Sequence, residues 1–379
     1  MMCAMKVVIR VDASLQIGTG HVMRCLTLAE ALKKQGRQVV FICREHTGHL
    51  MDVIQQKGFD LYALPCIEIS DVERRGIETK QEGKTSRATC YGDWLGGTQE
   101  QDSQACLSIL NRIQPTWLVV DHYAIDENWE KSLQETYQFL MVVDDLANRN
   151  HLCDLLLDQT YGRKSDEYVR RVPEHCTLLL GAQNALLRPE FLQWRACSLQ
   201  RRQSPVFEKL LITLGGMDTH NVTVRLLNAL IHCSLPAHLE ITVVMGANAP
   251  NLPLVLARAE TMPYSTCIKV GVTNMAELMT ESDLVISAAG ATTWEVACLG
   301  VPLILLQLAD NQATIMTKLS AIQAVLVWGI KQLEQDVQML EKISPPLLKR
   351  LSNILADLSD AKGVERVVNA MAQTQRLPV

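Results

Sequence analysis

The fold is decided by residues 6–43, which read KVVIRVDASLQIGTGHVMRCLTLAEALKKQGRQVVFIC. The stretch opens with a short apolar run at 6–11, bounded by polar residues, which is typical of a buried parallel strand. After a glycine-rich turn, residues 21–35 carry apolar side chains at helical spacing, and Gly36 stands where a C-terminal cap belongs. The run at 38–43 is the next strand. This stretch therefore predicts a strand–turn–helix–strand unit, the opening of a parallel α/β fold.

The same alternation continues along the chain. Short apolar runs predict further strands at 117–120, 139–143, 155–157, 209–214, 240–245, 267–270, 284–287 and 303–306. Helical spacing follows several of them, from residue 221 onward and at 274–279 and 292–299, and residues beyond 332 read only as helices. Strands that alternate with helices predict parallel sheets covered on both faces.

The chain length favours two domains, because 379 residues exceed one ordinary core. A polar stretch that ends at Pro205 predicts a boundary there, so we expect an N-terminal domain at 1–200 and a C-terminal domain at 201–379. The fold class is α/β and GT-B-like, with two Rossmann-like domains facing across a cleft, since such sheets bind ligands beyond the carboxyl ends of their strands. Residues 70–102 break the pattern and are either a disordered insertion or a substrate-facing loop.

Composition excludes several classes of protein. Hydrophobic residues make up 48% and charged residues 20%, which is a globular composition, and the net charge of -5 without a basic stripe argues against a nucleic-acid partner. The N-terminus lacks a signal peptide, and the apolar runs are too short to span a bilayer, so we expect a cytoplasmic protein without a membrane partner. The oligomeric state is open, and a monomer is the working expectation.

The cysteines and histidines suggest no metal site. The 12 cysteines are scattered without zinc spacing, and no cofactor is predicted. Cys25 lies on the apolar face of the first helix and is interpreted as a core residue rather than a nucleophile. His46, His49 and His151 are interpreted as surface or loop residues, and no function is assigned to them.

The turn at residues 18–21 is the first candidate site. Gly18 and Gly20 let backbone N–H groups approach a ligand, and the helix start behind them favours an anion. The dinucleotide fingerprint would need a third glycine where Met23 stands. By themselves the glycines indicate either a tight turn or a generic anion-binding loop.

His21 makes this turn a catalytic candidate. It lies at the helix start, which disfavours the imidazolium, so a neutral ring is expected to serve as a general base. Asp12 and Ser14 lie on the same strand-to-turn segment. Asp12 either orients the imidazole or satisfies loop amides, and both interpretations stay open.

Residues 287–295 form a second candidate site. A strand end and small residues there permit close backbone approach to a diphosphate, and Thr292 can cap the helix or donate to a phosphate. Glu295 can accept both hydroxyls of a ribose. The alternative interpretation is a capping box made by Thr292 and Glu295.

One motif resembles the N-terminal signature of the UDP-2,4-diacetamido-2,4,6-trideoxy-β-L-altropyranose hydrolases of pseudaminic acid biosynthesis: Arg10-x-Asp12-x-Ser14-x-x-Ile17-Gly18-x-Gly20-His21-x-x-Arg24-Cys25-Leu26-x-Leu28-Ala29. Further matches follow in order at 120–123, 144–147, 187–191, 215–218, 274–279 and 311–312. The C-terminal part also resembles the UDP-sugar domain of MurG-type glycosyltransferases, whose fold is GT-B. Asn184 departs from the family, which usually has Tyr there.

The resemblance implies a reaction and a set of roles. His21 would activate water for attack on the anomeric carbon, releasing UDP by C–O cleavage with inversion and without a metal. Glu295 would bind the ribose. The other substrate-binding roles that the resemblance implies are the diphosphate for Gly215 and Gly216, the uracil for the segment 270–275 with Met275, the nucleotide sugar for Arg188, and the sugar pocket for Asp121, Tyr123, Asn311 and Gln312.

Two rival functions remain. One is a UDP-sugar glycosyltransferase or epimerase on the same scaffold, although no strongly basic amphipathic segment suggests a membrane-facing acceptor site. The other is a non-catalytic protein that binds UDP-sugars. His21 argues against the second, because a pure binder needs no base at that position.

Overall fold

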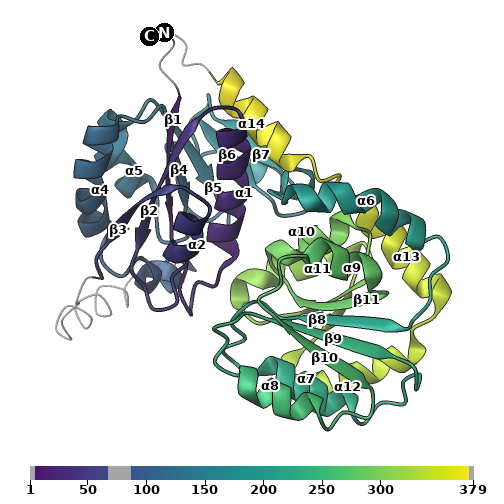
Figure 1. Ribbon diagram of the computed structural model, residues 1–379. Coiled ribbons are helices and arrows are strands. Elements are labelled where there is room, and N and C mark those ends of the chain that lie inside the picture. The colour runs from purple at the N-terminus through teal and green to yellow at the C-terminus, as the bar shows by residue number, and fades with distance from the viewer. Residues whose placement is uncertain (1–4, 67–86, 375–379) are drawn as a thin grey trace. The chain divides into compact units, whose positions relative to one another are not determined.

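A computed structural model describes residues 5–66 and 87–374. The chain divides into two compact units (Figure 1). The first runs to Asn184 and includes the chain again from Val364, and the second is Ala185–Gly363. Each unit is a parallel sheet with helices on its faces, so the predicted α/β class is confirmed.

The first unit has a seven-stranded sheet in the order β3-β2-β1-β4-β5-β6-β7. Its strands are β1 (Lys6–Val11), β2 (Gln38–Arg44), β3 (Asp60–Leu64), β4 (Trp117–Asp121), β5 (Phe139–Val143), β6 (Leu155–Asp158) and β7 (Thr177–Leu180). Its helices are α1 (Gly20–Lys34), α2 (Met51–Gln56), α4 (Gln99–Ile113), α5 (Glu127–Leu133) and α14 (Gly363–Gln373), with short 3₁₀ turns η1 (Arg87–Leu95), η2 (Gln134–Thr136), η3 (Ser165–Glu167) and η4 (Ala182–Asn184).

The second unit has a six-stranded sheet in the order β10-β9-β8-β11-β12-β13. Its strands are β8 (Lys209–Thr213), β9 (Glu240–Met245), β10 (Ser265–Val270), β11 (Leu284–Ala288), β12 (Leu303–Leu306) and β13 (Leu326–Trp328). Its helices are α6 (Pro189–Arg201), α7 (Val222–Leu230), α8 (Leu252–Ala259), α9 (Met275–Glu281), α10 (Ala291–Cys298), α11 (Ala313–Ala321), α12 (Leu333–Asp336) and α13 (Pro345–Ala356), with η5 (Asp310–Gln312), η6 (Ile330–Gln332) and η7 (Val337–Lys342).

The opening unit forms as its sequence predicts. The apolar side chains of α1 are buried, among them Val22, Leu26 and Leu32. The helix ends where Gly36 adopts a φ of 76°, and its N–H donates to the Lys33 carbonyl at 2.9 Å. A left-handed glycine after the last turn satisfies an otherwise free carbonyl, which is why the helix stops there.

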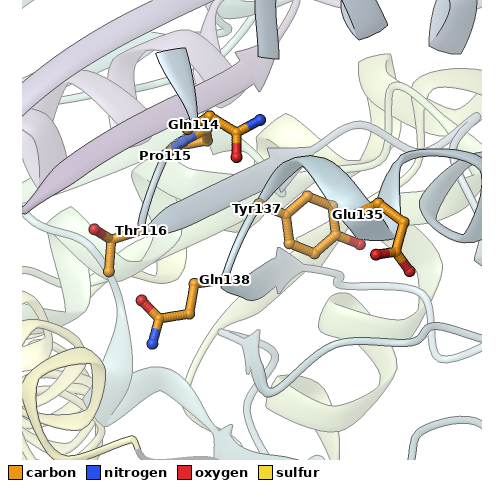
Figure 2. Close-up of a pocket in the computed structure, with 6 residues that line it drawn as sticks. All are labelled: Gln114, Pro115, Thr116, Glu135, Tyr137 and Gln138. Carbon is orange, nitrogen blue, oxygen red and sulfur yellow. The ribbon is translucent and has the colours of Figure 1, made fainter. Parts of the chain in front are cut away.

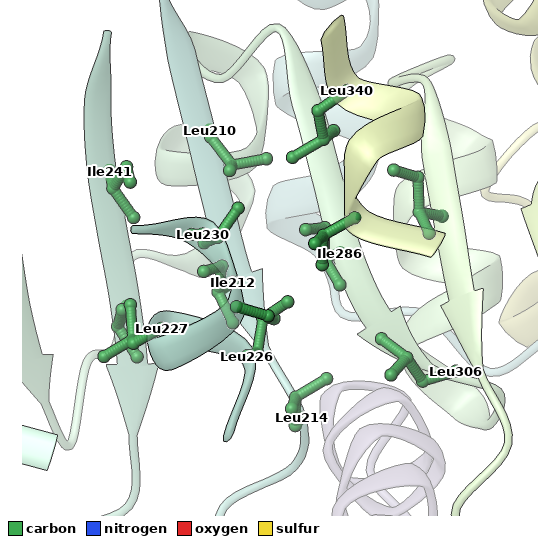
Figure 3. Close-up of a cluster of buried hydrophobic side chains, with 14 of the residues drawn as sticks. Leu210, Ile212, Leu214, Leu226, Leu227, Leu230, Ile241, Ile286, Leu306 and Leu340 are labelled. Atoms are coloured by element: carbon green, nitrogen blue, oxygen red, sulfur yellow. The ribbon is translucent and has the colours of Figure 1, made fainter. Parts of the chain in front are cut away.

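The core of the second unit shows why its central strands were recognisable. Leucine and isoleucine side chains of β8, α7 and β9 interdigitate in Figure 3, with Leu210, Ile212 and Leu226 almost completely buried. Burying each such side chain contributes about 1.5–3 kcal/mol. A central strand with helices on both faces therefore needs a continuous apolar run.

Three strands that the sequence analysis did not predict, β3, β7 and β13, all lie at sheet edges. An edge strand is covered incompletely, so its sequence can be mixed. In β3, only Leu64 is buried. This explains β3, whereas β7 and β13 contain apolar runs at 178–180 and 324–328 that the sequence analysis overlooked.

The division between the units differs from the expected boundary at residue 200. Helix α6 packs within the second unit, where the Ser198 hydroxyl donates to the Leu299 carbonyl at 2.7 Å. The polar stretch interpreted as a linker is also anchored there, since the Arg202 guanidinium donates to the carbonyls of Met279 and Thr280 at 3.1 and 2.9 Å. The C-terminal helix α14 instead joins the first unit, where Arg366 donates to the Gln183 carbonyl.

Both sheets reverse their strand order at one point. In the first unit the reversal lies between β1 and β4, and in the second between β8 and β11. The loops after these paired strands leave in opposite directions, which opens a crevice at their carboxyl ends. The two candidate sites follow β1 and β11, so each lies at the reversal point of its own sheet.

Candidate active site

His21 is the second residue of α1 and meets Asp121 at the end of β4. Its Nδ1 lies 2.6 Å from the Asp121 Oδ1, and its side chain is only 11% exposed. An ionised carboxylate only accepts hydrogen bonds, so Nδ1 is the donor and Nε2 is left able to accept a proton. This is the arrangement in which a carboxylate orients a catalytic imidazole.

Arg24 fixes the carboxylate that orients His21. Its Nε and one terminal nitrogen donate to the two oxygens of Asp121 at 2.6 and 2.7 Å, while the other donates to Asp145 at 2.6 Å. The Tyr123 hydroxyl also donates to Asp145, at 2.9 Å. Burial alone would raise the pKa of Asp121, but Arg24 and then His21 hold that pKa well below its usual range. Asp121 is therefore ionised and rigidly held.

Asp12 is not the residue that orients His21. Its Oδ1 accepts from the Arg10 guanidinium at 2.6 Å and from the backbone N–H of Arg44 at 2.7 Å. Of the two interpretations left open, the second comes nearer, because Asp12 satisfies a backbone amide, although not one of the loop as predicted. That amide belongs to β2, the neighbour of β1, because a carboxylate at the end of β1 is within reach of the adjacent strand.

A second buried ion network lies behind the site. Asp102 of α4 accepts from Arg10 at 2.7 Å and from Arg44 at 2.6 Å. Arg10 also pairs with Asp12, so the network contains two guanidinium groups and two carboxylates. His122 approaches the Asp12 Oδ2 with its Nε2 at 3.4 Å, while its Nδ1 accepts from the Ala124 N–H. This network holds the ends of β1, β2 and β4 together.

The loop between β1 and α1 is closed by Ser14. Its hydroxyl oxygen accepts from the N–H groups of Gln16 and Ile17 at 3.1 and 2.9 Å, so the Ser14 side chain is committed to the turn. Gly18 has a φ of 80°, which only glycine adopts without strain. A Cβ on Gly20 would meet no atom within 4 Å, so the protein's own packing does not require a glycine there.

Two aromatic rings of η1, within the stretch 70–102, lie near His21 together with Tyr123. Trp94 of η1 stacks on Tyr123 with centroids 5.7 Å apart at 21°, and its ring lies edge-on to His21 at 6.3 Å. Tyr91 contacts both Trp94 and Tyr123, at 4.7 and 5.3 Å. Of the two interpretations of residues 70–102, this described part agrees with a loop at the site, and residues 70–86 lie outside the described residues.

The residues of the candidate site in the first unit to which sequence reasoning gave no role are Arg24, Tyr91 and Trp94. Arg24 could have been found, because it follows His21 by three residues and so shares its helix face. Nothing in the local pattern connects Tyr91 or Trp94 with His21. Only the tertiary structure brings these rings to the end of β4.

In the second unit, Gly215 follows β8 and Gly290 precedes α10, which begins after β11. Gly215 has a φ of 92°. The Glu295 Oε1 accepts from Arg188 at 3.4 Å, and Arg188 also contacts Glu190 at 3.1 Å. Burial raises the pKa of Glu295, and Arg188 opposes that shift. The residues predicted to bind the ribose and the nucleotide sugar thus contact each other.

The capping-box interpretation of Thr292 and Glu295 does not hold. Gly290 is the N-cap of α10, and its N–H donates to the Thr293 hydroxyl at 3.2 Å. Thr292 is half-buried within the first turn. Because the helix begins at Ala291 and its N-cap is Gly290, Thr292 is not the N-cap, and Glu295 is left to contact Arg188.

The remaining predicted residues of the second unit occupy loops and helix starts. Met275 is the first residue of α9 and is half-buried. Asn311 and Gln312 lie in η5, and the Gln312 Oε1 closes the preceding loop by accepting from the N–H groups of Leu308 and Ala309 at 2.7 and 3.2 Å. Gly216 lies against Gly246, whose N–H donates to the Gly216 carbonyl at 2.9 Å.

Several other expectations can be compared with the structure. Cys25 is fully buried, and burial raises the pKa of its thiol, which confirms a core residue. His49 is exposed and His46 half-buried. His151 is not a surface residue as expected: it is buried, and its Nδ1 lies 2.6 Å from Glu130, because a loop residue can still be enclosed when a buried carboxylate pairs with it.

One pocket of about 230 Å³ lies away from both candidate sites (Figure 2). It is lined by Gln114, Pro115, Thr116, Glu135, Tyr137 and Gln138. Thr116 directly precedes β4 and Gln138 directly precedes β5, so the pocket is at the amino ends of the strands. Ligands of parallel sheets bind at the opposite ends, and we therefore assign this pocket no role in catalysis.

Across residues 5–66 and 87–374, no helix is long and apolar enough to cross a membrane. Within the same ranges, no three His, Cys, Asp or Glu side chains gather as a metal-ligand set.

Solved structures define the class of the fold. The chain is similar to MurG of Acinetobacter baumannii, with a TM-score of 0.66, 15% identity, and 97% of this chain and 99% of that chain covered. It is also similar to UDP-GlcNAc 2-epimerase of Neisseria meningitidis bound to UDP-GlcNAc, with a TM-score of 0.62, 12% identity, and 97% and 100% covered. The fold is GT-B-like. A family model, the glycosyltransferase family 28 C-terminal domain, matches residues 225–367.

The relatives found by sequence are more similar to this chain in identity than these solved structures are. The chain is 27% identical over 287 residues to UDP-2,4-diacetamido-2,4,6-trideoxy-beta-L-altropyranose hydrolase of Campylobacter jejuni, covering 75% of this chain and 85% of the relative. The resemblance expected from the motifs is therefore confirmed. A spore coat polysaccharide biosynthesis protein, SpsG of Bacillus subtilis, is 24% identical over 369 residues, 96% of each chain.

A third relative is an uncharacterised protein of Methanocaldococcus jannaschii. It is 25% identical over 306 residues, which are 80% of this chain and 55% of the relative. The chain thus spans little more than half the length of that relative.

Proposed function

We propose that this protein hydrolyses a UDP-linked 2,4-diacetamido-2,4,6-trideoxy sugar to the free sugar and UDP. The observation that carries the proposal is the His21–Asp121 pair, with Nδ1 and Oδ1 2.6 Å apart at the reversal point of the first sheet. The similarity to the Campylobacter jejuni hydrolase supports the choice of substrate and of reaction. The match to the glycosyltransferase family 28 C-terminal domain supports nucleotide binding by the second unit.

In the proposed reaction, Nε2 of His21 accepts a proton from water while the water oxygen attacks the anomeric carbon. The bond from that carbon to the phosphate oxygen breaks, its electron pair leaves with UDP, and the configuration inverts. Asp121 stabilises the imidazolium that forms, and Arg24 keeps Asp121 in place. A base placed in this way typically contributes ~10²–10⁴-fold to the rate.

Asp121 thus acts as a positioning residue, since both of its oxygens are used by protein groups. Asp12 ties the start of the loop before His21 to β2, and Ser14 closes that loop. Gly18 shapes that loop, and the open space beside Gly20 leaves room for the substrate.

The second unit binds the nucleotide in this proposal. Glu295 accepts the ribose hydroxyls, with Arg188 beside it to contact the nucleotide sugar. Thr292, at the start of α10, donates to the diphosphate. The remaining assignments follow the resemblance: Gly215 and Gly216 for the diphosphate, Met275 for the uracil, and Tyr123, Asn311 and Gln312 for the sugar.

Hydrolysis in ¹⁸O-labelled water tests the reaction. Label in the released sugar is expected, because water attacks carbon. Label in the phosphate of UDP would overturn the proposal, because it would mean attack at phosphorus. His21→Ala should abolish UDP release while UDP still binds, and retained turnover would exclude His21 as the base.

A second candidate is a UDP-sugar epimerase or glycosyltransferase, because the structural neighbours include both. An epimerase would return a UDP-linked sugar and accumulate no UDP. A transferase would release UDP only with an acceptor present. Stoichiometric UDP and free sugar, formed without any acceptor, would support hydrolysis over both.

A further inference from the structure

Three aromatic rings gather at His21, and the reaction as proposed uses only one of them. We call Tyr91, Trp94 and Tyr123 the ring cluster. Tyr123 lies edge-on to the His21 ring with centroids 4.7 Å apart, Trp94 stacks on Tyr123, and Tyr91 contacts both. No chemical step requires aromatic groups there, so a different role must be sought for Tyr91 and Trp94.

The ring cluster is built to stay in place and is not simply core. The Tyr123 hydroxyl donates to Asp145 at 2.9 Å, which fixes the ring that Trp94 covers. Leu95 is 1% exposed and anchors the end of η1. Tyr91 and Trp94 themselves are only half-buried, whereas Trp117 and Trp129 in the same unit are almost completely buried. Their rings therefore combine fixed positions with accessible surface.

We propose that the ring cluster is the subsite for an apolar face of the sugar and that it selects sugars with a methyl group at C6. This inference rests on the proposed function. Binding sites for small molecules are lined mainly by apolar and aromatic groups, with a few polar groups that orient the ligand. Here Nε2 of His21 is the polar group, and the rings beside it present faces on which C–H groups pack well.

The chemistry of the proposed substrate class fits an aromatic surface such as the ring cluster. A 6-deoxy sugar carries a methyl where an ordinary hexose carries a hydroxymethyl group. Packing the methyl on a ring loses nothing, whereas packing the hydroxymethyl there would remove water from a hydroxyl without replacing its hydrogen bond. The ring cluster would thus favour the deoxy sugar and also hold its anomeric carbon near His21.

The binding experiment uses the full chain with His21→Ala, so that the ligands survive. Calorimetry would measure the Kd of UDP and of the UDP-linked 2,4-diacetamido-2,4,6-trideoxyhexose. The measurement compares the His21→Ala chain with the same chain that also carries Trp94→Ala or Trp94→Phe. We expect Trp94→Ala to weaken nucleotide-sugar binding by about 10-fold or more, as expected for lost apolar contacts in a pocket. The Kd of UDP alone should not change, and Trp94→Phe should retain most of the affinity.

A matched control is Tyr62→Ala. Tyr62 is another half-buried ring of the first unit, and it packs against Arg112 of α4. Its loss should leave both Kd values unchanged. Thermal unfolding of each variant shows that the chain remains folded.

Turnover provides the test of selectivity. In the His21-containing enzyme, Trp94→Ala should reduce the kcat/KM preference for the 6-deoxy sugar over its 6-hydroxy counterpart by about 10-fold. An unchanged preference together with an unchanged Kd would overturn the subsite. If the wild-type chain binds the nucleotide sugar without hydrolysing it, the proposed function fails. The Kd comparison would still show whether the ring cluster binds the sugar.

Discussion

His21 Nδ1 and Asp121 Oδ1 lie 2.6 Å apart although 100 residues separate them in the chain. The contact follows from sheet order. Strand β1 leads into the loop before His21, β4 ends at Asp121, and the two strands are neighbours in register, with Val11 beside Asp121. The imidazole and the carboxylate are thus delivered by the start of α1 and by the last residue of β4, at the reversal point of one sheet.

Asp121→Asn tests this pair. The amide is the same size but can present N–H to Nδ1, which would favour the wrong tautomer of His21 and leave no negative charge to stabilise the imidazolium. We expect kcat for UDP release to fall by roughly 10²–10⁴-fold with KM nearly unchanged. Asp166→Asn, which alters an exposed carboxylate of η3, serves as the control. A kcat within a few-fold of wild type would show that Asp121 does not position the base.

Gly18 and Gly20 should respond differently to alanine. Gly18→Ala places a side chain at a φ of 80°, and we expect a loss of about 1–2 kcal/mol in the free energy of unfolding. Gly20→Ala adds a methyl that meets no protein atom within 4 Å, so its stability should match wild type to within about 0.5 kcal/mol. If the substrate occupies that space, Gly20→Ala should instead lower kcat/KM. Urea denaturation and steady-state kinetics separate the two effects, and an unimpaired Gly20→Ala enzyme would contradict the assignment.

Glu295→Gln tests the ribose contact. Hydrogen bonds to a charged group contribute about 1.5–3 kcal/mol, so UDP should bind roughly 10- to 100-fold more weakly. Wild type should also prefer UDP to 2′-deoxy-UDP, and the variant should lose most of that preference. Glu190→Gln is a matched control, because Glu190 also contacts Arg188. If Glu295→Gln keeps the full preference for UDP, Glu295 does not contact the ribose.

Asp158 should make stability depend on pH. Burial, then the nearby Asp145 carboxylate, raises its pKa from 3.8 to about 7, although Arg163 opposes the shift. Because the folded pKa is raised, the folded chain holds a proton that the unfolded chain has lost. The stabilisation from this group is therefore present below pH 4 and is lost as the pH rises through 7.

Asp158→Asn removes that titration. The free energy of unfolding of wild type minus that of the variant should decrease from pH 5 to pH 7, by at most about 1.4 kcal/mol per pH unit. Urea denaturation of both chains at pH 5, 6, 7 and 8 measures this difference in the free energy of unfolding. A difference that stays constant, or grows with pH, would show that Asp158 is already ionised at pH 5 in the folded chain.

The sequence by itself determined the class of the fold and the candidate base. Central strands such as β1 and β8 carry continuous apolar runs because both of their faces are buried. Such runs can be recognised in the sequence alone. His21 was recognisable for the same reason, since a strand, a glycine turn and a helix are consecutive in the chain. The edge strand β3 was missed because its incomplete burial imposes no such pattern, whereas β7 and β13 carry apolar runs at 178–180 and 324–328 that were overlooked.

Only the tertiary structure decided which residues surround His21. Sequence proximity made Asp12 a candidate to orient the imidazole, but Asp12 accepts from Arg10 and the Arg44 amide, and Asp121 takes that role. Strand order brings β4 beside β1, and the fold of η1 brings Trp94 to Tyr123. Side-chain hydrogen bonds and ring contacts extend only a few ångströms, so the partners of a catalytic residue depend on which strands are neighbours, and local sequence patterns do not record that order.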